Sequence, residues 1–292
     1  MIELKSDRLL VQIDEPDEGR NSTVRFDRAG YITRVQLDGK HEFCTVEPDN
    51  LSHPCSGGAG LCSEIKDNLW ADTPVGGKAP KFGVGLLTKP DEGRYQFFAK
   101  YETEHFPMNI ESDGRTAVFT TGAIPCMGYA LKQKKTVAVE GNTITVTYFY
   151  ENVGEKALSL GEYVHNFVTI DRLPIGPDYC LSMPTIAPQD GKKAKQETGT
   201  IYGKGSGFTY SAYNPAAAMI DVDGSEIAQD KPFSWKLTNA NTTASVSEED
   251  SFIPTRIPVW TIDHIASAEV YTNFDLAPGE THTYTRKWVF ED

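Results

Sequence analysis

The stretch TVAVEGNTITVTYFY, residues 136–150, decides the fold class of this chain. Two runs of β-branched and aromatic residues alternate with polar ones, and Glu140-Gly141-Asn142 separates them as a turn would. The same period of two recurs along the chain, for example in residues 8–13, 31–37 and 268–274. Asp-Gly pairs, whose type I′ turns favour hairpins, occur at 38–39, 113–114 and 223–224. The pattern predicts an all-β, antiparallel protein, either a large sandwich or a barrel.

Helical periodicity is weak by comparison. The best candidate is the short segment PAAAMI, residues 215–220. The Gly- and Lys-rich stretch 189–207 is expected to be a loop or a hairpin arm, and strand-like segments lie on both sides of it. We therefore expect a single domain over residues 1–292, a length that β sandwiches reach as one unit. The irregular region 51–77 is expected to be a long loop, where β proteins tend to build sites.

The charge of the chain argues against several classes of partner. It carries 28 basic and 41 acidic residues, a formal charge of −13. Nucleic acids and anionic membrane surfaces would be repelled, so neither is an expected partner. No apolar run is long enough to cross a bilayer, and the first residues lack the pattern of a signal peptide, so a cytoplasmic protein is expected. Five widely spaced cysteines without a matching histidine cluster predict reduced thiols and no metal site.

Three stretches give the chain a resemblance to a known family. They are VTYFYENVGEKALSLGEYVHNF (146–167), SAEVYTNFDLAPGETHTYTRKWVF (267–290), and GGAGLCSEIKD (57–67) followed by APKFGVGLL (79–87). In their order and spacing they resemble the aldose 1-epimerase, or galactose mutarotase-like, family. The likeness extends to VRFDRAGYITRVQLDG (24–39) and so covers essentially the whole chain. It implies a large antiparallel β supersandwich with a cleft across one sheet.

The resemblance also implies a reaction, the interconversion of α and β anomers of a sugar or sugar phosphate. A general base takes the proton of the anomeric hydroxyl while a general acid protonates the ring oxygen, and the opened ring closes again. This chemistry needs two titratable groups, expected on opposite sides of the ring, and no cofactor.

His165 is the expected acid, because an imidazole both gives and takes protons near neutral pH. Alternation places Tyr163, His165 and Phe167 on one strand face and Asn166 on the other. Tyr163 and Asn166 are expected to contact the substrate. The alternative for His165, taken from the residues alone, is a hydrogen-bonded histidine of the core.

Glu269 is the expected base, since a half-buried carboxyl can have the raised pKa that a base needs. A valine follows it where many members of the family have proline nearby, so Asp275 and Asp263 stay as alternative carboxylates. A surface carboxylate on an edge strand is the structural alternative.

Glu64 and Lys81 are the expected substrate contacts from the loop region. Lys81 stands where similar proteins often carry a histidine that contacts the sugar, so it implies either a changed substrate preference or loss of turnover. The alternative without a functional role is that Lys81 is a solvated lysine on the surface.

Three functions follow, in order of preference. The first is a mutarotase-like enzyme, the second a non-catalytic carbohydrate-binding protein, and the third an accessory domain of a lyase or hydrolase. An exposed edge strand would also allow a homodimer.

Overall fold

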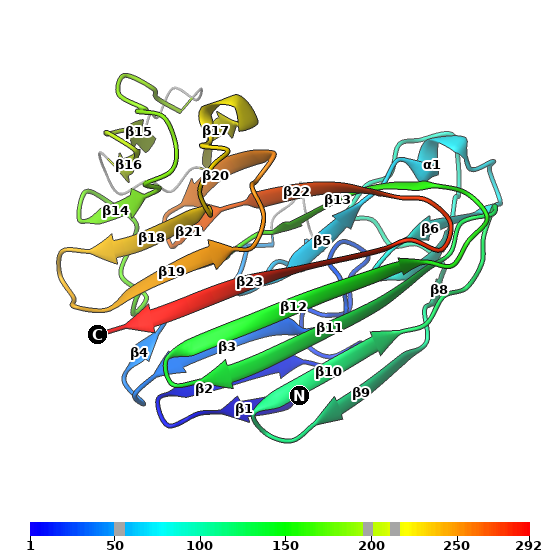
Figure 1. Ribbon diagram of the computed structural model, residues 1–292, viewed down its shortest axis with the longest axis horizontal. Coiled ribbons are helices and arrows are strands. Elements are labelled where there is room, and N and C mark those ends of the chain that lie inside the picture. Colours follow the sequence, from blue (N-terminus) through cyan, green and yellow to red (C-terminus); the bar gives the residue numbers. More distant parts are fainter. Residues whose placement is uncertain (50–55, 195–200, 211–216) are drawn as a thin grey trace.

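The computed structural model describes residues 1–49, 56–194, 201–210 and 217–292. In these residues the regular secondary structure is almost entirely antiparallel strand, and the strands form four sheets (Figure 1). The prediction of an all-β, antiparallel fold is confirmed. Helix is confined, in the described residues, to the short α1 (Leu69–Asp72) and the 3₁₀ turn η1 (Gly224–Glu226). The weak helical candidate at 215–220 is not helical where the structure describes it, because residues 218–220 open a strand; residues 215 and 216 lie outside the described ranges.

The largest sheet has ten strands in the described residues, in the order β15-β16-β14-β18-β19-β23-β12-β11-β10-β9. Its long strands β11, β12 and β23 run side by side across the molecule (Figure 1). The bounds of its strands are β9 (Met108–Ser112), β10 (Thr116–Thr121), β11 (Leu131–Glu140), β12 (Thr143–Asn152), β14 (Tyr179–Ser182), β15 (Ile201–Gly203), β16 (Gly207–Tyr210), β18 (Ser234–Asn239), β19 (Ser245–Asp250) and β23 (Thr281–Glu291).

A second sheet carries the residues of functional interest. Its strands pair in the order β17-β20-β22-β13-β5, and β21 pairs with β20. The bounds are β5 (Ser63–Lys66), β13 (Leu158–Val164), β17 (Ala218–Asp223), β20 (Arg256–Ile262), β21 (Ile265–Ala268) and β22 (Val270–Leu276).

Two smaller sheets complete the described architecture. The first has the order β1-β2-β3-β4 and the second the order β6-β7-β8. The bounds are β1 (Ile2–Lys5), β2 (Leu9–Asp14), β3 (Tyr31–Leu37), β4 (His41–Glu42), β6 (Lys78–Lys81), β7 (Gly85–Thr88) and β8 (Thr103–His105).

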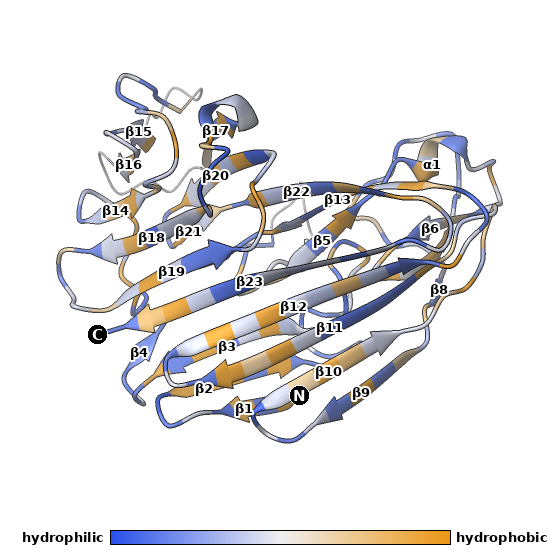
Figure 2. Ribbon diagram, viewed as in Figure 1, coloured by the Kyte–Doolittle hydropathy of each residue, from blue (hydrophilic) through white to orange (hydrophobic). Residues whose placement is uncertain are grey.

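The hairpin of β11 and β12 shows how the sequence pattern produces the layers. Glu140 pairs with Thr143 across a turn in which Gly141 has φ 54°, a value that glycine adopts without strain. Along β11 buried residues alternate with less buried ones, and apolar and polar colours alternate along the same strands (Figure 2). One face of this sheet therefore packs into the core while the other meets solvent.

The six-stranded sheet packs its apolar face into the same core. Leu160 and Val164 of β13 and Val270 of β22 are buried in the hydrophobic cluster that also contains the inward residues of β11 and β12. The opposite face of β13 carries Gly161 and Tyr163. Alternation thus sends one set of side chains into the sandwich and the other set to the outer face, where the candidate site lies.

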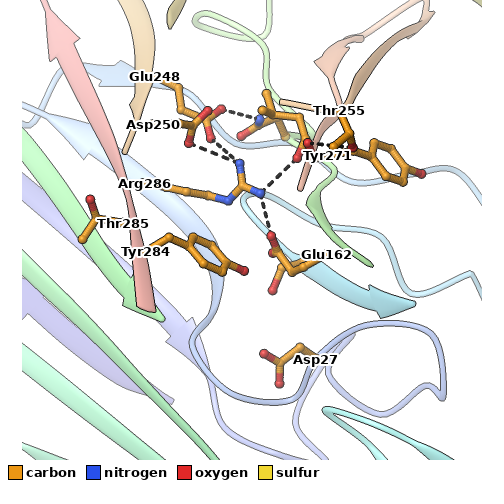
Figure 3. A network of polar contacts seen from close by, with 12 residues as sticks. Asp27, Glu162, Glu248, Asp250, Thr255, Tyr271, Tyr284, Thr285 and Arg286 are labelled. Atoms are coloured by element: carbon orange, nitrogen blue, oxygen red, sulfur yellow. Dashed lines mark hydrogen bonds and ion pairs between the residues drawn. The ribbon is translucent and has the colours of Figure 1, made fainter. Parts of the chain in front are cut away.

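A charged network joins the two large sheets inside the core (Figure 3). Arg286 of β23 contacts Glu162 of β13 at 2.6 Å and, at 3.2 and 3.3 Å, Glu248 and Asp250 of β19. All four side chains are fully buried. Burial, and then the nearby Glu248 carboxylate, raise the pKa of Asp250 well above its ordinary value, because one guanidinium cannot balance three carboxylates. A proton retained on the Glu248–Asp250 pair reduces this excess of negative charge.

No helix in the described parts of the chain has the length and apolar character of a membrane span.

Candidate active site

The register of β13 and β22 brings His165 and Glu269 together. Tyr163 pairs with Tyr271 and Val164 with Val270, so one further step along both chains sets His165 opposite Glu269. Nε2 of His165 lies 3.2 Å from Oε1 of Glu269. The two groups that the sequence singled out are therefore neighbours on the outer face of one sheet. They are not separated by a cavity, as an arrangement on opposite sides of a sugar ring would require.

The His165 ring lies among aromatic side chains. It stacks on Phe167 with ring centroids 3.8 Å apart, and Trp260 and Phe26 meet it edge-on. Burial, and to a smaller degree the Arg25 guanidinium, lower the pKa of His165 well below its ordinary value. The imidazole is therefore neutral near neutral pH.

Ser267 determines which ring nitrogen of His165 carries the hydrogen. The Ser267 hydroxyl donates its single hydrogen to the backbone carbonyl oxygen of His165. Nδ1 of His165 lies 3.0 Å from the same Ser267 oxygen, so Nδ1 must be the donor in that contact. In the neutral ring the hydrogen is then on Nδ1, and the lone pair of Nε2 faces Glu269.

The carboxyl group of Glu269 can carry a proton and donate it in a hydrogen bond to the lone pair on Nε2 of His165. Burial raises the pKa of Glu269 to about 7, although Arg25 and Lys66 act to lower it. The hydroxyl of Tyr271 lies 3.5 Å from Oε2 of the same carboxyl. The Nε2–Oε1 contact thus accommodates one proton, which can sit on either partner.

A second cluster lies beside this pair and is centred on Glu64. The hydroxyl of Tyr163 donates to Oε2 of Glu64 at 2.7 Å, and Nζ of Lys81 lies 3.0 Å from Oε1. Burial alone would raise the pKa of Glu64, but Lys81, Lys66 and Arg25 outweigh it and lower that pKa to about 2. Glu64 is therefore an ionised carboxylate held by cations, whereas Glu269 keeps its proton to near neutral pH. Such opposed environments are typical of acid/base sites.

Lys81 is 7% exposed, so the alternative of a solvated surface lysine is wrong. Besides Glu64, its ammonium group donates to the carbonyl oxygen of Ile65 at 2.7 Å. The short β6–β7 hairpin positions it, with Lys81 paired to Gly85. It forms part of the cluster that extends from Tyr163.

Arg25 also belongs to the site, and sequence reasoning missed it. Its guanidinium lies 2.9 Å from Glu47, 3.4 Å from the hydroxyl of Tyr163 and 3.5 Å from Glu64. It is 8% exposed. Its only sequence signal was a place inside the opening stretch of the family likeness. Arg25 can stabilise negative charge that develops on a substrate oxygen.

Asn166 requires a correction, because the structure does not bring it to this site. Its side-chain amide donates to Glu248 at 2.7 Å and to the carbonyl oxygen of Ala268 at 2.9 Å, and its oxygen accepts from Trp288 at 3.1 Å. These contacts lie in the core on the far face of the sheet, and they use both hydrogens of the amide and its oxygen. Asn166 also has φ 50°, a left-handed conformation that asparagine tolerates better than most residues. Asn166 therefore has a structural role in the core.

The two alternative carboxylates also lie apart from His165. Asp263 is exposed and contacts the neighbouring His264. Asp275 pairs with Ser159 and lies six residues along the chain from Glu269, on the same face. The structure therefore places Glu269, and neither alternative, beside His165.

Two cavities open beside the tyrosine pair. A groove of about 670 Å³ is lined by residues of β5, β13, β20 and β22 and of the chain after β5: Lys66, Asp67, Asn68, Ser159, Leu160, Gly161, Arg256, Tyr271, Asn273, Phe274 and Asp275. A smaller one of about 180 Å³ shares Lys66 and Asp67 with it and adds Glu64, Lys81, Trp70 and Tyr95. Among the described residues no three His, Cys, Asp or Glu side chains are grouped as a metal ion would need. Cys44, Cys62, Cys126 and Cys180 are free thiols, and Cys55 lies outside the described ranges.

The chain matches no protein-family model and no curated protein sequence. Its fold is similar to solved structures. A galactose mutarotase-like protein from Lactobacillus casei ATCC 334 is 12% identical, with a TM-score of 0.58 over 100% of both chains. A galactose mutarotase-like protein from Clostridium acetobutylicum is 13% identical, with a TM-score of 0.57 over 99% of this chain and 94% of that one. An aldose epimerase homologue from C. elegans is 8% identical, with a TM-score of 0.51 over 99% and 98%. At these identities the likeness concerns architecture, and this chain has the antiparallel β supersandwich fold of the galactose mutarotase-like proteins.

Proposed function

We propose that the protein is an aldose 1-epimerase-like isomerase that interconverts the anomers of a sugar. The observation that supports this most directly is the 3.2 Å contact between Nε2 of His165 and Oε1 of Glu269, in a tautomer fixed by Ser267. The pair can give one proton and take one at the same time. The structures with which this chain shares its fold carry aldose epimerase and mutarotase names, which supports the same reaction class.

The side-by-side arrangement suits the chemistry. The anomeric hydroxyl and the ring oxygen of a pyranose are bonded to the same carbon, so two adjacent groups on one protein face can reach both. The reactive form arises when the shared proton moves from Glu269 to Nε2 of His165, which gives an imidazolium–carboxylate pair. Glu269 then removes the hydroxyl proton while Nε2 of His165 protonates the ring oxygen. The bond between the anomeric carbon and the ring oxygen breaks, and an open-chain aldehyde forms.

Rotation about the bond next to the aldehyde exposes its other face. His165 then takes back the proton from the former ring hydroxyl, while Glu269 returns its proton to the carbonyl oxygen. The ring closes as the opposite anomer, and the pair again holds a single proton. Arg25 and Lys81 stabilise negative charge on the substrate hydroxyls during these steps. Every proton is conserved, and no group other than these side chains is required.

A second candidate is a carbohydrate-binding protein without turnover. One observation favours it: the side chains of His165 and Glu269 are only 5% and 11% exposed and contact each other directly. A sugar must therefore compete with that contact to reach the pair.

The direct test is proton NMR of a freshly dissolved pure anomer. With catalytic amounts of protein, the anomeric signals of at least one aldose or aldose phosphate should equilibrate faster than in buffer. His165→Asn and Glu269→Gln should each reduce that acceleration by about 10²–10⁴-fold, the usual contribution of a general acid or base. His105→Asn and Glu249→Gln, at exposed positions of β8 and β19, are matched controls that should keep full activity. If sugars bind saturably but none equilibrates faster, the second candidate is correct.

A further inference from the structure

The groove on the outer face continues in line with the acid/base pair. On that face, successive cross-strand pairs of β13 and β22 are Tyr163–Tyr271, Gly161–Asn273 and Ser159–Asp275. Because two residues of a strand span about 7 Å, these rows extend the face by about 13 Å beyond the tyrosines. Tyr271 connects the two regions, since it lines the groove and its hydroxyl lies 3.5 Å from Glu269.

Gly161 opens the floor of this groove. It lies between Lys66 of β5 and Asn273 of β22, and a Cβ at this position would come within 2.9 Å of the amide oxygen of Asn273, so glycine leaves that amide its place in the groove. A pyranose with its anomeric carbon at Glu269 covers the tyrosine row and leaves the rows of Gly161 and Ser159 uncovered. The volume of about 670 Å³ lies within the range of roughly 300–1,000 Å³ that is usual for small-molecule sites. There is room for more than the sugar that reacts.

The lining of the groove matches hydroxyl groups. Oδ1 of Asp67 accepts from the backbone amide of Leu69, but the buried Oδ2 has no hydrogen-bond partner among the described residues. Asp67 lines both the groove and the smaller cavity, so its carboxyl can accept a hydrogen bond from a ligand hydroxyl bound there. Asn273 and Ser159 add groups that both donate and accept.

The charges make a strongly anionic ligand less suitable here. The groove cations Lys66 and Arg256 already face Glu64 at 3.4 Å and Asp221 at 2.7 Å. The carboxyls of Asp67 and Asp275 also line the space and would repel a phosphate or a uronate. Two aromatic rings, Trp70 and Tyr95, line the adjoining small cavity and offer apolar faces of the kind on which sugar rings stack.

We propose that this groove is a subsite for a second sugar residue, so that the preferred ligand is a reducing disaccharide or longer oligosaccharide whose free anomeric end meets His165 and Glu269. The proposal rests on the proposed function, because that function places the reducing end of the ligand at His165 and Glu269 and the next sugar in the groove. The groove itself binds the neighbouring residue through Asp67, Asn273 and Ser159.

The test compares maltose, cellobiose and lactose with D-glucose, the sugar at the reducing end of all three. Anomer equilibration by the intact protein should show a kcat/KM at least about tenfold higher for one of the disaccharides, the effect of one hydrogen bond to a charged group. Ser159→Trp, at an exposed position of the groove, should lower the ratio of disaccharide to glucose rates toward one. Asn273→Leu is a second variant at another exposed position and should lower the same ratio.

Ser182→Trp is the matched control, because Ser182 is an exposed serine on a strand of the other large sheet; its ratio should equal that of the unchanged protein. If glucose equilibrates as fast as every disaccharide, or if Ser159→Trp slows both equally, the subsite is refuted while the proposed function stands. If no sugar equilibrates faster, the proposed function fails. Calorimetric measurement of the binding of the same sugars then tests the subsite by itself. Tighter disaccharide binding that is lost in Ser159→Trp supports the subsite, and equal or absent binding refutes it.

Discussion

Nε2 of His165 and Oε1 of Glu269 lie 3.2 Å apart, at the next cross-strand position after Tyr163 and Tyr271. Because Ser267 keeps the His165 hydrogen on Nδ1, the contact between Nε2 and the carboxyl must hold the remaining proton. The pair therefore behaves as one titrating unit, whose apparent pKa values belong to both residues. The single-proton state is the one that can act as acid and base in the same step.

The first prediction concerns the pH dependence of anomer equilibration. Burial raises the pKa of Glu269 to about 7 and lowers that of His165 well below its ordinary value. The pair has one proton between these limits, so kcat/KM should fall as the pH rises through about 7, and fall again well below pH 6.5. A rate that rises steadily above pH 7 would contradict the shared-proton state.

Substitution of Arg25 gives a second test with the same pH profile. Its guanidinium acts to lower the pKa of both Glu269 and His165. Arg25→Gln should therefore shift both limbs of the pH profile to higher pH, in addition to any loss of rate. Arg25→Lys keeps the charge and should leave the limbs where they are. A profile that does not move in Arg25→Gln would show that Arg25 does not act on the pair.

The second prediction concerns folding stability. The pKa of Glu269 is about 7 in the folded protein against an ordinary value of 4.5, so between these pH values the folded state binds a proton that the unfolded state has lost. The contribution of Glu269 to the free energy of unfolding should therefore decrease from about pH 4.5 to pH 7 by on the order of 3 kcal/mol and then level off. His165, whose pKa is lowered on folding, contributes in the opposite direction below its ordinary value of 6.5, so the comparison of the wild type with a Glu269 variant isolates the effect. Glu269→Gln lacks this dependence, so the variant should gain stability relative to the wild type as the pH rises. Urea unfolding at pH 4.5 and pH 8 measures this, and Glu249→Gln at an exposed position is the control that should show no such gain.

The third prediction concerns Ser267 as a positioning residue. Nitrogen chemical shifts of the His165 ring should show the hydrogen on Nδ1 in the wild type. Ser267→Ala removes the acceptor for that hydrogen and should increase the population with the hydrogen on Nε2, whereas Ser267→Thr keeps a hydroxyl and should restore the wild-type spectrum. A tautomer that is unchanged in Ser267→Ala would show that another group fixes it, whatever the stability of the variant.

Strand periodicity was enough to predict part of this arrangement. Alternation put Tyr163 and His165 on one face, and the structure has them there. The same rule put Asn166 on the other face, and it should have argued against Asn166 as a substrate contact. The family likeness supplied the pairing of His165 with Glu269, because a period of two gives the face of a strand but not its partner strand.

The remaining contacts depend on segments that are far apart in the chain. Arg25 reaches Tyr163, and the buried Lys81 pairs with Glu64, which compensates its charge. From the sequence alone, charged residues such as Arg25 and Lys81 are expected to be exposed, because an unpaired charge is costly to bury. Ser267 is a small polar residue without a motif, and its importance comes from a contact with His165 that only the folded chain creates.

The same limit applies to Arg286, which leads to the fourth prediction. In the sequence it is one basic residue in the last strand, yet it is the cation between Glu162, Glu248 and Asp250 in the core (Figure 3). Arg286→Met would leave three buried carboxyls without their counter-charge, so it should cost about 3–5 kcal/mol, the usual result of removing one partner of a buried ion pair. Urea unfolding measures this loss.

The control is Arg34→Met, because Arg34 pairs with Glu42 near the surface and its side chain is 38% exposed. Exposed ion pairs contribute little, so the loss should be at most about 1 kcal/mol. The unbalanced negative charge can also be reduced by neutralising one of the carboxylates. The double variant Arg286→Met with Glu162→Gln should recover part of the loss, since one fewer carboxyl then lacks a partner. Equal losses for Arg286→Met and Arg34→Met would show that the buried network adds nothing to stability beyond a surface pair, and that the layer behind His165 is held by apolar packing alone.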